Sequence, residues 1–217
     1  MIKRIFRSKT YRRLKWSIID FFIKPSREEM VYRKKVLDCE FLRQKGIVTN
    51  IGDVDLVGMP HIESHQNSII KIGKNVILVS DQTANTAGIN HPVILSAEGP
   101  NSKIIIGDGV GMSGTSIVTC STIEIGENTF IGANVNIYGT DFHCIRGEER
   151  ILQKTSAEAP TAPIKIGKNC WIASNVTILK GVTIGDNAVI GAMSLVNKDV
   201  PQNTLYAGVP AKFIRNV

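Results

Sequence analysis

Aliphatic residues recur at every sixth position through much of the chain. One series is Ile125, Ile131 and Ile137, and a longer one is Ile166, Ile172, Ile178, Ile184, Ile190 and Val196. Neither a helix, with a period of 3.6, nor an alternating strand, with a period of two, places apolar residues at this spacing. The pattern predicts short strands joined by corners, three to a coil, whose inward aliphatic side chains stack from coil to coil.

A small residue often follows the inward aliphatic one, as in Ile125-Gly126 and Ile184-Gly185. We interpret it as the residue at which the chain turns tightly. The repeat predicts a mainly β solenoid over residues 50–217. It breaks between Ile137 and Ile166, so residues 140–163 are expected to leave the solenoid as a loop, and long loops on a regular scaffold often carry function.

Residues 1–49 have a different pattern and are predicted to be a basic helical segment. Ser26 and Glu29 have the spacing of a capping box, and Lys45-Gly46 is a helix stop, so we expect a helix over 27–43. Of the 26 Lys and Arg residues in the chain, 14 lie in residues 1–47. The amphipathic stretch 1–24 is expected to pack on the protein or on a neighbouring subunit; peripheral contact with an anionic membrane surface is the alternative.

Cysteine usage and charge bear on the compartment and on partners. The four cysteines form no CxxC pair, and no signal-peptide pattern precedes them, so free thiols in a reducing cytoplasm are expected. The apolar run 16–23 is too short to span a bilayer. A cytoplasmic location is therefore expected, and the inner face of the membrane is the alternative. The sequence pI is about 9.3, but no nucleic-acid-binding motif accompanies the charge, and no nucleic acid partner is expected.

Several motifs in order carry a resemblance to a known family. They are the run Ile137-Tyr-Gly-Thr-Asp-Phe-His143 and the segments 166–172, 181–192, 197–201 and 207–211. Over about 104–215 the chain resembles the hexapeptide-repeat acyltransferases, and in particular the branch of maltose, galactoside and capsular-polysaccharide O-acetyltransferases. The resemblance implies a left-handed parallel β-helix, a homotrimer with its active sites between adjacent prisms, acetyl-CoA as donor, and no metal.

His143 matches the catalytic histidine of that family. A sugar hydroxyl does not ionise at neutral pH, and a neutral imidazole can accept its proton as the oxygen attacks a thioester. Asp141 is predicted either to orient the imidazole or to bind the acceptor, with loop capping as the alternative. Trp171 matches a residue that lines the acetyl and acceptor end of related sites; the alternative is a tryptophan that packs at an edge.

The donor positions also follow from the resemblance. Ser174 and Ala192 lie 18 residues apart, one full coil, and match the backbone positions that bind the pantetheine arm. Positions that meet the nucleotide end are matched by Asn197, Lys198, Lys212 and Arg215. Where maltose- and galactoside-type enzymes carry an asparagine one coil before the histidine, this chain has Met112-Ser-Gly-Thr115, so Ser113 and Thr115 are acceptor-binding candidates.

The expected activity is transfer of acetyl from acetyl-CoA to a saccharide hydroxyl, in the biosynthesis of a surface polysaccharide such as capsule or lipopolysaccharide. N-acetylation of an amino sugar is the alternative. If residues 1–24 touch a membrane, the acceptor is expected to be lipid-linked. A zinc enzyme similar to carbonic anhydrase needs three converging histidines, and the spacing of His61, His65, His91 and His143 does not favour it. A non-catalytic scaffold is the third class, and the motif around His143 disfavours it.

Overall fold

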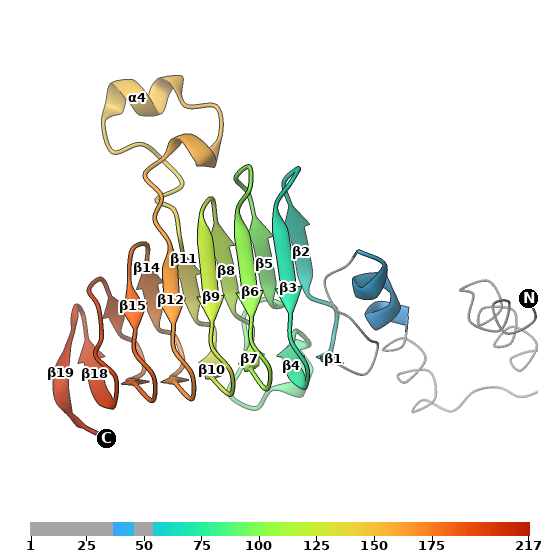
Figure 1. Cartoon of the computed structure of the whole chain (residues 1–217), viewed down its shortest axis with the longest axis vertical. Helices are drawn as coiled ribbons and strands as arrows, with labels where there is room; N and C mark the ends of the chain where they lie inside the picture. Colours follow the sequence, from blue (N-terminus) through green and yellow to red (C-terminus); the bar gives the residue numbers. More distant parts are fainter. Residues whose placement is uncertain (1–36, 46–53) are drawn as a thin grey trace, which may run out of the picture. The chain divides into compact units, whose positions relative to one another are not determined.

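The computed structural model describes residues 37–45 and 54–217, and its strands form three parallel sheets wound as a prism (Figure 1). Sheet A contains β1 (Val54–Val57), β4 (Val76–Val79), β7 (Gly111–Ser113), β10 (Phe130–Ala133), β13 (Trp171–Ile172), β16 (Val189–Ile190), β18 (Thr204–Gly208) and the antiparallel β19 (Ala211–Asn216). Sheet B contains β2 (His61–Ser64), β5 (Ile94–Ala97), β8 (Ser116–Thr119), β11 (Asn136–Tyr138), β14 (Thr177–Leu179) and β17 (Leu195–Val196). Sheet C contains β3 (Ile69–Ile72), β6 (Lys103–Ile106), β9 (Thr122–Ile125), β12 (Ile164–Ile166) and β15 (Thr183–Ile184).

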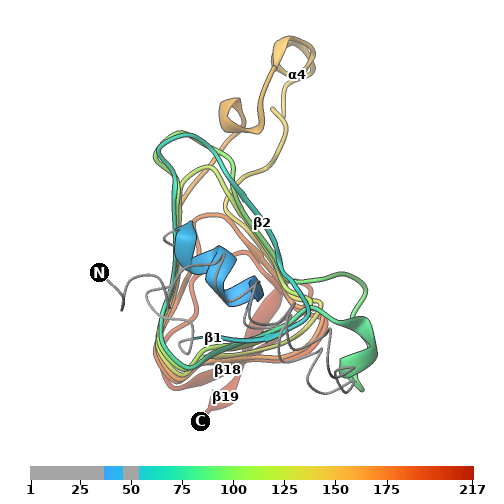
Figure 2. The same cartoon turned by 90° about the vertical axis from the view of Figure 1, so that its right-hand side faces the viewer.

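The chain visits sheets A, B and C in turn, so three strands complete one coil and the cross-section is triangular (Figure 2). Ile137 pairs with Ile178, and Ile178 pairs with Val196, in register along sheet B. All three side chains are buried in one core cluster. The six-residue period therefore marks the inward column of each sheet, as predicted, and the fold is the expected left-handed parallel β-helix.

Asparagine, and not the predicted small residue, occupies most of the corner positions with left-handed backbone. Nine of the eleven described non-glycine residues with positive φ are asparagines. Asparagine tolerates this region better than other residues that bear a Cβ. Asn187 accepts a hydrogen bond from the Asn169 side chain (3.3 Å) and donates one to Asn203 (2.9 Å), so these amides also tie successive coils together.

The glycine after the aliphatic residue serves a different purpose. Gly126 does not have a positive φ, but a Cβ at this position would lie 2.6 Å from the backbone of Gly167 in the next coil. Glycine is required there because the coils approach closely, and the tight turn itself follows two residues later at Asn128 (φ +56°). The predicted reason for the glycine was therefore wrong, although its position at the corner was right.

Met193 breaks the asparagine rule and provides a stability test. The corner residues between sheets A and B at equivalent positions are Asn134, Asn175 and Met193, all with φ near +60°. We expect Met193→Asn to stabilise the protein by about 1 kcal/mol, because asparagine adopts this conformation at lower cost. The reciprocal Asn175→Met should destabilise it by a similar amount. Denaturant unfolding of both variants checks the pair, and equal midpoints for wild type and both variants would contradict it.

The N-terminal prediction is described only in part. Residues 37–44 are helical, within the predicted helix 27–43 and one residue beyond it, whereas residues 1–36, with the amphipathic stretch 1–24, lie outside the described residues. The chain separates into two compact units, and the boundary between them lies between Leu37 and Asp38, whereas the sequence placed it at residue 49. Cys39 and Leu42 are buried in the solenoid core cluster, so the end of this helix packs on the prism.

The cysteines are free thiols, as predicted, and none forms a disulfide. Burial raises the pKa of the Cys170 thiol, which disfavours its reactive thiolate form. Among the described helices, none has the length and apolar character of a membrane span.

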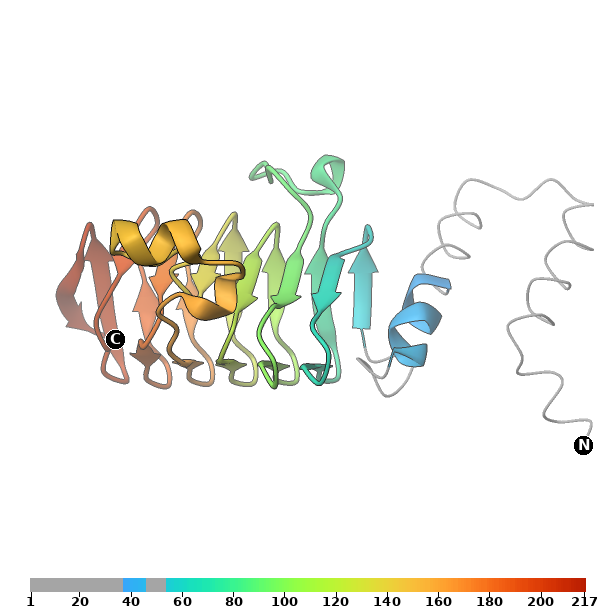
Figure 3. The ribbon, with the colours of Figure 1, turned by 90° about the horizontal axis from the view of Figure 1, so that it is seen from above.

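Two excursions leave the prism from different corners (Figure 3). The predicted loop runs from the end of β11 to the start of β12 and contains α4 (Gly147–Leu152) and η3 (Ser156–Glu158). The second, between β4 and β5, contains η2 (Gln82–Ala84) and was not predicted. It is held by Asn134, whose side chain accepts from the Asn90 N–H (2.9 Å) and donates to the Gly88 carbonyl (3.0 Å).

Candidate active site

The loop that carries His143 rises from the corner between sheets B and C on a paired stem (Figure 2). Gly139 still bonds to Val118 of the preceding coil (2.9 Å), and Thr140 forms an antiparallel bridge with Thr161. The Asp141 N–H donates to the Pro160 carbonyl (3.0 Å). The backbone is therefore fixed up to the residue two before His143.

A tight turn then presents His143. Its N–H donates to the Asp141 carbonyl (2.7 Å) across Phe142, whose φ is +62°. This is a γ-turn in its rarer, strained form. Gln153 braces the far side, since its amide donates to the Phe142 carbonyl (2.7 Å) and accepts from the Cys144 N–H (2.8 Å). A strained residue held from both sides is typical of functional sites.

The His143 imidazole is exposed and makes no hydrogen bond to any described residue. The ring of the preceding residue, Phe142, packs edge-on against the Tyr138 ring (centroids 5.2 Å apart). Burial raises the pKa of the Tyr138 phenol, whose O–H donates to Asn136 (2.9 Å). The loop backbone is thus fixed around an imidazole that is free to take a proton from a ligand.

Asp141 does not contact the imidazole through its carboxylate. Its Oδ1 accepts from Lys180 Nζ at 2.6 Å, and both side chains are about 30% exposed. Lys180 follows β14 in the next coil. This contact fits the alternative of a loop-holding role for Asp141, and no sequence motif marks Lys180 as its partner.

Trp171 is exposed on β13 of sheet A. Sheet A, with β1 and β18, forms the side of the prism opposite the loop (Figure 2). It pairs in register with Phe130, and both side chains are more than half exposed. Gly111 pairs with Phe130 on the other side, so no side chain covers that ring. An exposed pair of aromatic residues on adjacent strands is a surface suited to a ligand or a neighbouring subunit.

Ser174 and Ala192 stack at the corner between sheets A and B, as their spacing predicts. Ile172 pairs with Ile190, and the Met193 N–H donates to the Ser174 carbonyl (3.0 Å). The N–H groups of Ser174 and Ala192 themselves donate to no described residue. Two unpaired donors on successive coils, with small side chains beside them, fit an extended ligand that offers carbonyl acceptors along the corner.

The four candidates for the nucleotide end of the donor lie in two places. Asn197 and Lys198 are exposed after β17, at the B–C corner that also carries His143. Lys212 and Arg215 are exposed on β19, which pairs with β18 at the end of sheet A. One chain therefore has the base at the B–C corner and the free N–H groups at the A–B corner, with sheet B between them, while the tryptophan lies on the outer face of sheet A.

The two acceptor candidates differ in accessibility. Ser113 is half-buried on the outer face of β7 in sheet A. Thr115 is fully buried, and its hydroxyl is 3.4 Å from the Ser113 carbonyl. Thr115 has no exposed surface with which to contact an acceptor, because its side chain turns inward at the corner.

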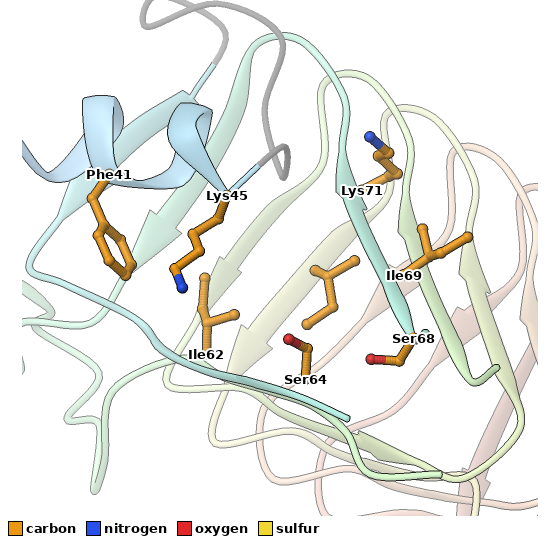
Figure 4. A pocket seen from close by; sticks show the side chains of 8 residues that line it. Phe41, Lys45, Ile62, Ser64, Ser68, Ile69 and Lys71 are labelled. Atoms are coloured by element: carbon orange, nitrogen blue, oxygen red, sulfur yellow. The ribbon is translucent and has the colours of Figure 1, made fainter. Parts of the chain in front are cut away.

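A pocket at the first coils is separate from these residues. Its volume is about 340 Å³, and Figure 4 shows Phe41 and Lys45 of the N-terminal helical segment facing Ile62 and Ser64 of sheet B across it. None of the predicted site residues lines it. Elsewhere in the described ranges, no three His, Cys, Asp or Glu side chains gather at a spacing that suits a metal ion.

The outer faces of the three sheets differ in charge. Sheet C exposes Lys71, Lys103, Glu124 and Lys165. In contrast, the strands from β4 to β18 of sheet A and from β5 to β17 of sheet B contain no charged residue. Three large apolar side chains on the loop, Ile145, Ile151 and Leu152, are 77–85% exposed. Uncharged faces and an apolar loop tip are typical of surfaces that a partner covers.

The coils and site define a hexapeptide-repeat solenoid protein with an exposed histidine on a braced loop. The family model described as bacterial transferase hexapeptide (six repeats) matches residues 163–198, and the model described as hexapeptide repeat of succinyl-transferase matches 122–141. A relative in Escherichia coli, named "Putative colanic acid biosynthesis acetyltransferase WcaF", is 34% identical over 145 residues, or 67% of this chain and 68% of the relative. The chain belongs to the bacterial hexapeptide-repeat transferase family.

Other comparisons agree on this fold. The galactoside O-acetyltransferase of Escherichia coli is 46% identical over 102 residues, 47% of this chain and 48% of the relative. The crystal structure of a maltose O-acetyltransferase from Clostridium difficile matches 95% of this chain and 86% of its own, with 25% identity and a TM-score of 0.51. An N-acyltransferase from Bacillus cereus, AntD, shares the fold at 21% identity (TM-score 0.59; 82% and 88% covered). The chain spans about half the length of the first curated relatives that it matches.

Proposed function

We propose that this protein is an acetyl-CoA-dependent acetyltransferase that acetylates a saccharide hydroxyl, with His143 as general base. The observation that carries the proposal is the exposed, unbonded imidazole on a loop whose backbone is tied on both sides. Such a group can accept a proton from a ligand without first breaking a contact to the protein. The relatives of the chain support this class of reaction, since they include a galactoside O-acetyltransferase and a putative colanic acid biosynthesis acetyltransferase.

The chemistry needs one proton acceptor and one activated acyl donor. The hydroxyl oxygen of the acceptor attacks the thioester carbonyl carbon while its proton passes to the imidazole. The resulting oxyanion collapses, the carbon–sulfur bond breaks, and the departing CoA thiolate takes the proton back from the imidazolium. The products are the acetyl ester and free CoA, so atoms and charge balance without a metal or redox partner.

The donor is proposed to lie along the A–B corner. The free N–H groups of Ser174 and Ala192 would meet carbonyl acceptors of the pantetheine arm, and Trp171 would flank the thioester end. At the nucleotide end, Lys212 and Arg215 would supply positive charge to phosphates, and Lys198, with Asn197 as a polar contact, would do so from the B–C corner of the neighbouring subunit. Ser113 stays an acceptor-binding candidate, and Thr115 is left out because it is buried.

The base and the donor corner are proposed to meet between subunits of a homotrimer. Within one chain, sheet B separates the His143 corner from the corner of Ser174 and Ala192. Rotation about an axis parallel to the prism brings the B–C corner of one copy against the A–B corner of the next, and three copies close the ring. The uncharged faces of sheets A and B and the apolar loop tip would then be covered, while charged sheet C faces solvent.

Mixed trimers test the shared site directly. We expect His143→Ala and Ala192→Trp to inactivate homotrimers, because the first removes the base and the second fills the donor corner. Trimers assembled at random from equal amounts of the two variant chains should recover about one quarter of wild-type activity. A site is intact only where the His143 of one chain meets the unmodified donor corner of its neighbour, and each condition holds for half of the chains. The control is a mixture of the two separately purified homotrimers under conditions without subunit exchange. No recovery in the mixed trimers would place both residues in one chain's own site, and a native mass below three times 23.8 kDa would exclude the trimer.

The acceptor is proposed to be a surface-polysaccharide unit or its lipid-linked precursor, with an amino sugar as the second candidate. A panel of hydroxyl- and amino-bearing saccharides, with mass spectrometry to locate the acetyl group, distinguishes the two. Acetyl on oxygen supports the first, and acetyl found only on nitrogen supports the second. We also propose a cytoplasmic location, and residues 1–24 are the segment proposed to contact the inner membrane face.

A further inference from the structure

Lys180 lies outside every motif that predicts the site, yet it holds the loop that presents His143. Its ammonium group is 2.6 Å from the carboxylate of Asp141, the residue two before His143. The backbone carbonyl of Asp141 accepts a hydrogen bond from the His143 N–H. The ion pair joins residues 39 positions apart, so it ties the loop to the coil that follows it.

This contact differs from an ordinary surface ion pair. Lys168 and Glu127 also link neighbouring coils, but their atoms are 3.4 Å apart and both side chains are more than half exposed. The Lys180–Asp141 pair is shorter, and its side chains are about 30% exposed. Exposed pairs contribute little to stability, whereas a shorter and partly buried pair restricts the groups that it joins more strongly.

The position of the pair explains why restriction matters. The stem hydrogen bonds end at Asp141, and the turn at Phe142 is strained, with a φ of +62°. Gln153 holds the far side of the turn from within the same loop. On the near side of the turn, the Phe142 N–H donates to the Thr140 hydroxyl of the stem (3.2 Å), and Lys180 ties Asp141 to the coil that follows. Without Lys180, the strained turn loses its link to that coil and can shift the imidazole.

We propose that Lys180 is a positioning residue for His143, acting through Asp141. The inference rests on the proposed function, because it takes His143 to be the base. A displacement of about 1 Å in a reacting group can cost roughly a hundredfold in rate. The effect is expected in kcat, because the substitution leaves the Ser174 and Ala192 N–H groups, which are proposed to bind the donor, unchanged in every subunit.

The test uses the full chain with Lys180→Met, Lys180→Arg and Asp141→Asn. We expect Lys180→Met to lower kcat about 10- to 100-fold with the KM for acetyl-CoA within about twofold of wild type. Arginine should restore kcat to within a few-fold. The double variant Lys180→Met/Asp141→Asn should lose no more than the worse single variant, because both changes remove one interaction. Lys168→Met is the matched control and should retain wild-type kcat and KM.

A second readout does not depend on turnover. Hydrogen exchange at the His143 amide, which bonds to Asp141, should be faster in Lys180→Met and unchanged in Lys168→Met. Unchanged exchange together with wild-type kcat in Lys180→Met would overturn the inference, as would losses in the double variant equal to the product of both singles. If wild type transfers no acetyl group to any acceptor, the proposed function fails and the link of Lys180 to catalysis fails with it, while faster exchange would still establish the loop contact.

Discussion

Replacement of His143 by alanine is expected to lower kcat by about 10²–10⁴-fold, the usual contribution of a general base. Without the imidazole, no other titratable side chain on the turn can take the hydroxyl proton, since the Asp141 carboxylate is paired with Lys180. Binding of acetyl-CoA should be unchanged, because the substitution leaves in place the N–H groups of Ser174 and Ala192 that are proposed to bind the donor. Release of the CoA thiol in the presence of the saccharide panel measures the first effect, and calorimetric titration with acetyl-CoA the second.

The control for this variant is His65→Ala. His65 lies at the same B–C corner but in the first coil, is exposed, and contacts the Gln66 carbonyl through its ring (3.1 Å). Its replacement should leave kcat and KM unchanged. Undiminished turnover in His143→Ala would remove the base assignment, and loss of acetyl-CoA binding in that variant would mean that the loop contributes to the donor site.

The period of six predicts the core well because each inward residue reports its own position in the coil. Ile172, Ile178 and Ile184 point inward on sheets A, B and C in turn, and all three are buried. The same register locates the loop, since a break in it is visible without any tertiary information. Local sequence was also sufficient to place Ser174 and Ala192 on one corner, because one coil spans 18 residues there.

Contacts between residues far apart in the chain could not be predicted from the sequence. Lys180 meets Asp141 across 39 residues, and the unpredicted excursion is held by a bond from Asn90 to Asn134 across 44. No local pattern marks either partner. The role of the corner glycine was mispredicted for the same reason. Gly126 approaches Gly167 closely only once the coils are stacked, and no local pattern shows that contact.

The stacking distance makes Gly126 a position where one added methyl group should cost much stability. A Cβ at Gly126 would lie 2.6 Å from the carbonyl carbon and oxygen of Gly167 and 2.7 Å from the Lys168 nitrogen. These are backbone atoms of the next coil, which cannot rotate away as a side chain can. We expect Gly126→Ala to destabilise the protein by about 3 kcal/mol, at the upper end of the range for overpacking. For a chain of this size, that corresponds to a melting temperature lower by about 6–12 °C.

Gly147→Ala is the matched control, because it adds the same methyl group where space is open. The nearest atom to a Cβ there is a guanidinium nitrogen of Arg150 at 3.9 Å, and Gly147 begins α4 on the loop. Alanine is also the better helix former, so stability should stay within about 0.5 kcal/mol of wild type or rise slightly. Thermal and denaturant unfolding of both variants decides the matter. If Gly126→Ala unfolds at the same midpoint as Gly147→Ala, the coils can separate at this corner without cost, and close stacking does not explain the glycine.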